Sequence, residues 1–153
     1  RTSYVTFTMH IGTLIGVFLF PTLCERLGRR RAFGLFFILS AIVVMGVSFG
    51  THTYQSLLYF APLMALFTIG VSAGFALYFP ELFPTRLRAT GLGFCYNTGR
   101  IVTAPLPWLT GKVIGAFNGS VAAGMGLFAV IYLIGLIAVN KAPETKGQPL
   151  PEN

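Results

Sequence analysis

Arg100 is the residue whose type and position most strongly indicate chemistry, because it lies in an apolar stretch about 12 residues after Arg88. If that stretch is a membrane-spanning helix, Arg100 lies about 18 Å along its axis, near the middle of the bilayer. A cation at that depth costs at least about 2.5 kcal/mol on insertion scales. We therefore expect Arg100 to line a polar cavity and to pair with an anionic solute or with an acid along the same path. A structural ion pair to a helix outside this sequence is the alternative.

Other polar residues recur at helical spacing around Arg100. Tyr96 and Asn97 lie one helical turn before it, and Thr103 lies about one turn after it. Residues three and four apart are neighbours on a helix surface, so these side chains are predicted to share one face, with Gly93 at its edge. The candidate substrate-binding residues are therefore Arg100, Asn97, Tyr96 and Thr103.

His10 is the other ionisable residue predicted to lie well inside a membrane span, and Thr6 and Thr13 share its helical face. Histidine titrates near physiological pH, which makes His10 a candidate for proton coupling. A hydrogen-bonded structural histidine is the alternative. The acidic residues lie in predicted loops or in the tail, at Glu25, Glu81, Glu144 and Glu152. A carboxylate that couples protons is therefore expected outside this sequence.

Residue sets typical of enzymes are not found in the sequence. It contains no Asp, no spacing typical of metal ligands, and no Gly-rich phosphate-binding loop that ends in Lys followed by Ser or Thr. We predict that the chain is not an enzyme and that it uses neither a cofactor nor a metal.

The composition indicates a protein that resides in lipid. Hydrophobic residues make up 54% of the 153 residues, charged residues make up 10%, and the mean hydropathy is +0.74, whereas soluble proteins contain about 25% charged residues. The net charge of +7 could suggest a nucleic-acid partner. However, the basic residues form short clusters beside apolar runs, which is typical of membrane orientation signals. The fold class is therefore all-α and polytopic.

The length of the apolar runs predicts about five membrane-spanning helices in one bundle, residues 1–142, followed by a polar tail, residues 143–153. A short turn at Gly28 is expected between the first two spans. Pro105 and Pro107 are expected to kink the fourth span. Small residues four apart, at Gly12/Gly16, Gly70/Gly74 and Gly111/Gly115, are expected to bring helices close together. The predicted spans are residues 4–23, 32–49, 56–78, 90–108 and 121–139.

The distribution of positive charge tests this arrangement, because five crossings force successive loops onto alternate sides. Arg1 is the one basic residue in the segments assigned to the external side. Cytoplasmic loops are enriched in Lys and Arg, so the tail is predicted to be cytoplasmic. The basic residues on that side are Arg26, Arg29, Arg30, Arg31, Arg86, Arg88, Lys141 and Lys146.

Three loop motifs resemble those of the major facilitator superfamily. Glu25-Arg-Leu-Gly-Arg-Arg-Arg31 is similar to the D-R-x-G-R-R loop signature, although Glu replaces the usual Asp and Pro21 stands where the signature usually begins with Gly. Residues 80–91, PELFPTRLRATG, resemble the loop between the tenth and eleventh helices of the sugar-porter-like branch. Residues 143–147, PETKG, resemble the motif that follows the twelfth helix.

This resemblance implies that the spans are helices eight to twelve of a twelve-helix transporter, and that the N-terminal part of the same transporter is missing. It implies alternating access of a small polar solute, an organic anion or sugar, by proton symport, in the plasma or inner membrane. It also implies a cytoplasmic charge network that locks the outward-open state, made up of Glu25, Arg29, Arg30, Glu81, Arg86, Arg88 and Glu144.

The sequence is compatible with more than one class of solute. The branch resemblance favours a neutral sugar and a facilitator, whereas Arg100 favours an organic anion, because a carboxylate would neutralise a costly buried cation. A membrane sensor or structural subunit that does not transport, built on the same helices, is the alternative from a different class.

Overall fold

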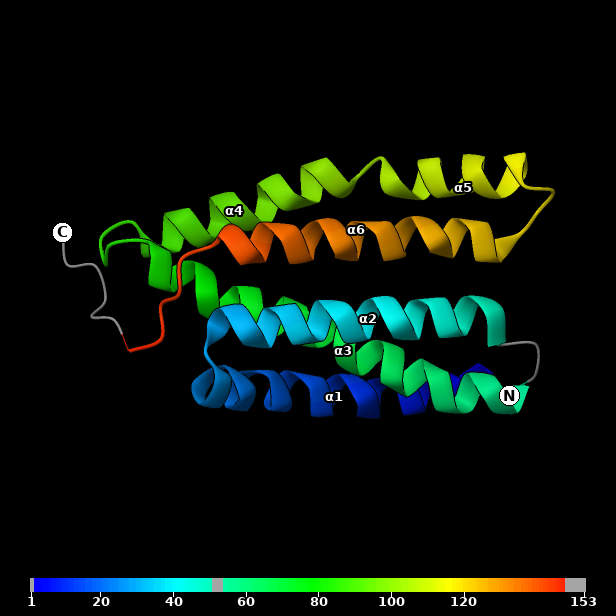
Figure 1. The fold of residues 1–153 in the computed structure, drawn as a ribbon, viewed down its shortest axis with the longest axis horizontal. Helices are drawn as coiled ribbons and strands as arrows, with labels where there is room; N and C mark the ends of the chain where they lie inside the picture. The colour runs from blue at the N-terminus through cyan, green and yellow to red at the C-terminus, as the bar shows by residue number, and fades with distance from the viewer. Residues whose placement is uncertain (1, 51–53, 148–153) are drawn as a thin grey trace.

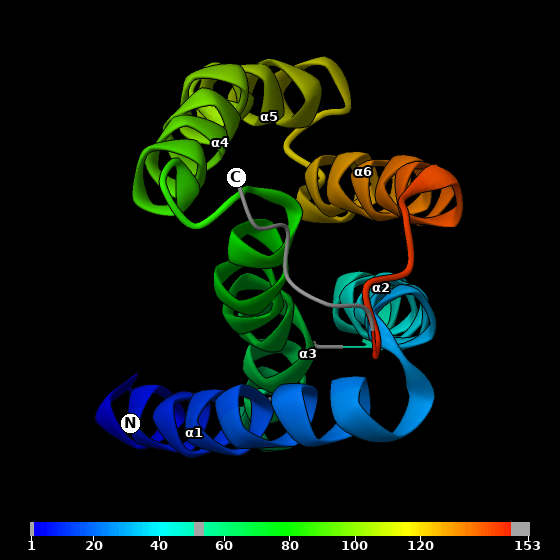
Figure 2. The same cartoon turned by 90° about the vertical axis from the view of Figure 1, so that its left-hand side faces the viewer.

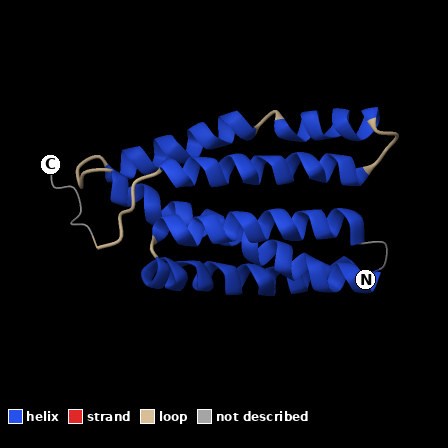
Figure 3. Cartoon of the chain, in the orientation of Figure 1, coloured by secondary structure: helices blue, strands red, loops and turns tan. Residues whose placement is uncertain are grey.

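The computed structural model of the chain describes residues 2–50 and 54–147. These residues form α-helices joined by short turns, with no strand in the described part (Figure 3). In chain order the helices are α1 (Thr2–Leu27), α2 (Arg29–Gly50), α3 (Tyr54–Leu82), α4 (Arg88–Thr103), α5 (Leu106–Ala116) and α6 (Val121–Lys141). The fold is therefore all-α, as predicted.

Four of these helices are long and apolar enough to cross a membrane. They cover Ser3–Leu27, Arg29–Ser48, Tyr54–Leu82 and Gly124–Lys141. The remaining two, α4 with 16 residues and α5 with 11, follow one another in the chain, and α4 contacts α3 whereas α5 contacts α6 (Figure 2). Together they are long enough for one further crossing of about 20 residues. The membrane boundaries of the individual spans stay a prediction.

The break between α4 and α5 lies at Ala104 and Pro105. Proline has no backbone N–H and its ring clashes with the preceding turn, so a helix cannot continue undistorted through it. Pro107 lies in the first turn of α5, where a missing N–H costs nothing. The prolines therefore separate two helices instead of kinking a single one.

The basic segment 24–31, expected to be a loop, is almost entirely helical. Helix α1 continues to Leu27, α2 begins at Arg29, and Gly28 alone separates them. Gly28 has a φ of +92°, a conformation that other residues rarely adopt. Its predicted role in a tight turn is confirmed. The helices extend beyond the apolar runs because the basic residues that follow are still good helix formers.

The connections place the basic segments at one end of the bundle. The end of α1, the start of α2, the α3–α4 turn and the end of α6 gather at the left of Figure 1. Contacts confirm this proximity, since Lys146 donates to the carbonyl of Arg26 and Arg29 pairs with Glu81. The clustering agrees with the alternation expected from the positive charges.

Aromatic side chains form the core where α1, α2 and α3 meet. Phe20 and Phe36 are fully buried, and the ring of Phe20 packs edge-on against Phe33 and Phe36 with centroids 4.8 Å apart in both pairs. Figure 2 shows α1 crossing α3 on one side of this core and α2 lying beside α6 on the other.

Close crossing of α1 and α3 depends on glycine. A Cβ added to Gly12 would lie 2.1 Å from the backbone oxygen of Pro62, and one added to Gly16 would lie 2.3 Å from that of Leu66. The predicted packing role of these two glycines is confirmed, since the backbone atoms of Pro62 and Leu66 cannot move away without a shift of α3. Gly111 and Gly115, by contrast, have nothing within 4 Å in the described part of the chain.

We predict that Gly12→Ala destabilises the protein by about 1–3 kcal/mol, the usual cost of overpacking, because α1 and α3 must move apart. Gly46→Ala is the matched control, since its Cβ would lie 3.5 Å from Phe60, an ordinary contact. The midpoints of thermal unfolding in detergent measure both changes. Equal midpoints for the two variants would contradict the prediction.

Candidate functional site

The four predicted residues lie on α4, where Arg100 contacts Tyr96 and Thr103, and Asn97 contacts the preceding turn. The guanidinium of Arg100 lies over the ring of Tyr96, 5.3 Å from its centroid. The side-chain amide of Asn97 donates to the carbonyl of Gly93 at 2.8 Å, and the Thr103 hydroxyl donates to that of Gly99 at 2.9 Å. The cation–π contact orients Arg100 without neutralising its charge.

Arg100 has no ion pair with any carboxylate in residues 2–50 and 54–147. It lies in the last turn of α4, close to the middle of the α4–α5 segment. Arg100, Asn97 and Tyr96 are all exposed in this chain. The arrangement leaves a planar cation that can accept a carboxylate through two parallel hydrogen bonds.

His10 is not brought near this face. It lies on α1, at the opposite side of the bundle from α4 in both Figure 1 and Figure 2. His10 is exposed, and no hydrogen bond to its ring involves another described residue. Any proton coupling through His10 would therefore act at a distance from Arg100.

A second cluster of polar residues lies where the basic segments gather. The guanidinium of Arg29 on α2 forms a two-point salt bridge with the carboxylate of Glu81 on α3. Its Nη2 lies 2.6 Å from Oε1 and its Nε lies 3.1 Å from Oε2. The two side chains are 16% and 17% exposed. This two-point geometry in a mostly buried place makes the pair stronger than a surface ion pair.

Glu144 in the tail caps the start of α2. Its carboxylate accepts the backbone N–H of Arg29 at 2.8 Å, of Arg30 at 3.1 Å and of Lys146 at 3.2 Å. The first N–H groups of a helix lack partners within the helix, and they carry partial positive charge. Glu144 satisfies them from 115 residues away in sequence. A Cβ on Gly28 would lie 2.9 Å from Glu144 Oε2 and would displace this carboxylate, and the φ of +92° favours glycine in addition.

Two further contacts hold the tail, and sequence reasoning had not identified them. Thr145 donates a short hydrogen bond to the carboxylate of Glu81. The Tyr78 hydroxyl donates to the carbonyl of Pro143 at 2.6 Å. The position of Tyr78 at the end of an apolar span is a weak signal, because a tyrosine there usually places its hydroxyl at the membrane interface. We define the tail clamp as Arg29, Tyr78, Glu81, Pro143, Glu144 and Thr145.

The other residues expected in the charge network are placed differently. Arg88 donates through Nε to the carbonyl of Pro80 at 3.0 Å, so it braces the α3–α4 turn. Glu25, Arg86 and the side chain of Arg30 form no ion pair with another residue in the described ranges. The structure therefore brings together Arg29, Glu81 and Glu144 and leaves the remaining charges apart.

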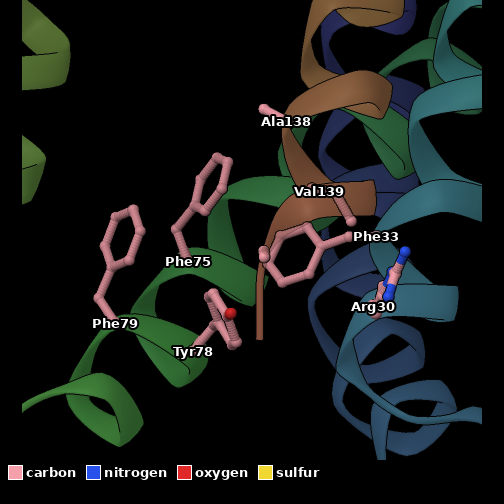
Figure 4. Close-up of a pocket in the computed structure, with 8 residues that line it drawn as sticks. Arg30, Phe33, Phe75, Tyr78, Phe79, Ala138 and Val139 are labelled. Atoms are coloured by element: carbon pink, nitrogen blue, oxygen red, sulfur yellow. The ribbon is translucent and has the colours of Figure 1, made fainter. Parts of the chain in front are cut away.

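A small apolar pocket of about 170 Å³ lies beside the tail clamp, between α2, α3 and α6. Figure 4 shows the rings of Phe33, Phe75, Tyr78 and Phe79 around it, with Arg30 approaching from α2. The hydroxyl of Tyr78 is already engaged by Pro143. The pocket therefore offers little to recognise a polar solute, and the polar face on α4 is the better candidate for a substrate site.

The Glu144 contacts predict a pH dependence. Burial raises the pKa of the Glu144 carboxyl, but the three backbone N–H donors lower it further, so its pKa lies below the ordinary value. The contact is therefore complete above the ordinary glutamate pKa and is lost as the pH falls through the lower folded-state pKa. We expect the protection factors of the Arg29 and Arg30 amides, after correction for the intrinsic pH dependence of hydrogen exchange, to fall as the pH is lowered, with a midpoint below the pKa of a free glutamate.

Glu144→Gln is the control for this measurement, because it keeps an acceptor oxygen and removes the titration. Exchange of the same two amides should then show no such midpoint. A midpoint in the wild type at or above the ordinary glutamate pKa would rule out the capping role of the charged form.

Comparison with known proteins identifies the family. Residues 1–153 match the family described as "Sugar (and other) transporter". The chain belongs to this family. It is a member of the major facilitator superfamily, as the loop motifs predicted, and the family consists of transporters and not of enzymes.

Several relatives are about 30% identical to the chain over the aligned residues. It is 30% identical over 148 residues to the "Probable 4-methylmuconolactone transporter" of Cupriavidus pinatubonensis, which covers 92% of this chain and 33% of that protein. It is 28% identical over 152 residues to the inner membrane metabolite transport protein YdjE of Escherichia coli, covering 99% and 33%. It is 30% identical over 134 residues to the cis,cis-muconate transport protein of Acinetobacter baylyi, covering 87% and 31%. The chain thus spans about a third of the length of these relatives.

Proposed function

We propose that the chain is the C-terminal part of a secondary transporter that carries a small organic anion, and that Arg100 contacts the anionic group. The observation that carries the proposal is the exposed guanidinium of Arg100, near the middle of the α4–α5 segment, without a carboxylate partner in the described ranges. Transporters place their substrate sites near the bilayer midplane. A bound carboxylate would offset the cost of a cation there.

The relatives support an anion over a neutral sugar. The names of two of them refer to muconate and to a methylmuconolactone, and muconate is a dicarboxylate. A neutral sugar is the second candidate, because the family description begins with sugar. Asn97 and Tyr96 suit either solute, since an amide and a phenol can bond to hydroxyl groups and to carboxylates. Arg100 is what favours the anion.

Transport proceeds by alternating access and is driven by protons, with His10 or a carboxylate outside this chain as the proton carrier. The protein resides in a cell membrane with its C-terminal tail on the cytoplasmic side, because the basic segments lie at the same end of the bundle as the tail. The tail clamp helps to hold the outward-open state.

Uptake by the complete transporter in proteoliposomes tests the proposal. Labelled cis,cis-muconate should accumulate above its external concentration when an inward proton gradient is imposed, and an uncoupler should abolish this accumulation. A neutral hexose is the comparison solute. Uptake of the hexose without uptake of any carboxylate would favour the sugar. Ligand binding without accumulation of either would favour a sensor.

A further inference from the structure

A groove between α2 and α6 differs in character from the apolar pocket beside the tail clamp. Its volume is about 740 Å³, within the range of small-molecule sites. The two helices lie side by side in Figure 1 and Figure 2, on the opposite side of the core from α1. The lining residues are Arg30, Arg31, Gly34, Leu35, Ile38, Leu136, Asn140 and Glu144.

One end of the groove is cationic. Arg30 and Arg31 are exposed, and neither side chain pairs with a carboxylate in the described part of the chain. Glu144 lines the same end, but its oxygens accept the backbone N–H groups of Arg29, Arg30 and Lys146. Two arginines and one engaged carboxylate leave a net charge of about +1, with both guanidinium groups available to a ligand.

Apart from Asn140 on α6, the rest of the groove is lined by apolar residues. Leu35 and Ile38 are 41% and 45% exposed, and Leu136 lines the facing side from α6. Gly34 has no side chain to fill the groove between the two helices. A Cβ added at this position would lie 3.6 Å from the side chain of Leu136. From Arg31 to Ile38 the surface changes from cationic to apolar over about 10 Å along α2.

We propose that this groove binds one phospholipid with a net negative headgroup. The phosphodiester lies against Arg30 and Arg31, at the end of the bundle where the basic segments gather, and an acyl chain lies along Leu35 and Ile38. The charges favour this occupant, because two unpaired guanidinium groups attract a phosphate more strongly when the headgroup has no ammonium group to neutralise it. The planar guanidinium of arginine also forms two parallel hydrogen bonds to phosphate oxygens. Basic pockets between membrane helices are known to suit such headgroups. The proposal is independent of the transported solute.

Native mass spectrometry of the complete transporter in detergent tests this inference, with phosphatidylglycerol and phosphatidylcholine as probes. One phosphatidylglycerol should bind more tightly than phosphatidylcholine. Arg31→Gln should weaken phosphatidylglycerol binding about five-fold, and Arg30→Gln with Arg31→Gln about 25-fold, since each basic residue near an anionic lipid surface contributes about that factor. Gly34→Leu should weaken binding of both lipids, because the side chain fills the groove.

Arg26→Gln is the matched control, since Arg26 is an exposed arginine of the same basic segment that does not line the groove. Its phosphatidylglycerol affinity should equal that of the wild type. Equal losses for Arg26→Gln and Arg31→Gln, or equal affinities of the wild type for the two lipids, would overturn the proposal. If Gly34→Leu does not fold, a phosphatidylglycerol with a photoreactive acyl chain replaces it. Crosslinking should then fall on the α2 peptide that contains Leu35 and Ile38, and crosslinking elsewhere would contradict the assignment.

Discussion

Arg100→Gln is expected to lower kcat/KM for carboxylate uptake by about ten- to a hundred-fold, because hydrogen bonds to a charged group contribute about 1.5–3 kcal/mol. The guanidinium has an exposed face, no carboxylate partner in residues 2–50 and 54–147, and a ring of Tyr96 that orients it. Glutamine keeps part of the length and polarity but cannot neutralise an anion. Uptake of a neutral hexose, if it occurs, should be unchanged.

Lower uptake by Arg100→Gln can be distinguished from a folding defect. If Arg100 lies in the middle of a membrane span, as proposed, its removal lowers the cost of insertion, and Arg100→Gln should be expressed and inserted at least as well as the wild type. Arg100→Lys should lie between the two, because lysine keeps the charge and loses the planar fork. Lys112→Gln is the matched control. Lys112 lies on α5 with its ammonium 4.1 Å from the centroid of the Trp108 ring, and its loss should leave uptake unchanged.

Unchanged uptake and affinity of Arg100→Gln for every carboxylate tested would contradict the hypothesis that the substrate is an organic anion. Arg100 would then be a structural cation that pairs with a helix outside this chain. That alternative predicts a lower thermal midpoint for Arg100→Gln in the complete protein, a readout that the substrate role does not require.

The helices could largely be predicted from the sequence because a bilayer imposes a length and a polarity on each of them. Charge-free runs located α1, α2, α3 and α6, whereas Pro105 was expected to kink one span and instead lies at the break between α4 and α5. The ends of the helices were predicted less well. Hydropathy indicates where a segment leaves the lipid, but a helix can extend beyond that point. It ends where the backbone hydrogen bonds are interrupted, as at Gly28 and Pro105.

The candidate site divides in the same way. The face of Tyr96, Asn97, Arg100 and Thr103 follows from the 3.6-residue period, so local spacing was enough to place its members together. The pairing of Arg29 with Glu81 joins residues 52 apart, and that of Tyr78 with Pro143 joins residues 65 apart. Such contacts depend on which helices lie side by side, and apolar helices carry little information about their neighbours. The loop motifs implied a network, but its members could be assigned partners only from the fold.

Arg29→Gln is expected to destabilise the protein by about 1–3 kcal/mol, less than the 3–5 kcal/mol for breaking a fully buried pair, since both partners are partly exposed to solvent. Glu81 would keep Thr145 as a donor but lose the cation that it faces. Arg86→Gln is the matched control, because Arg86 is exposed and forms no ion pair in the described ranges. Thermal unfolding of the complete transporter measures both variants, and equal midpoints would contradict a stabilising ion pair.

The same variant tests whether the tail clamp is a switch or a fixed brace. All of its contacts join parts of this chain, namely α2, α3 and the tail, so they can favour one transport state only if the other state breaks or weakens them. If the clamp belongs to the outward-open state, Arg29→Gln should raise the ratio of inward-open to outward-open protein about five- to 150-fold, the equivalent of 1–3 kcal/mol. Accessibility of a single cysteine on each side of the membrane measures this ratio. A lower thermal midpoint with an unchanged ratio would make the clamp a brace within the bundle, present in both states.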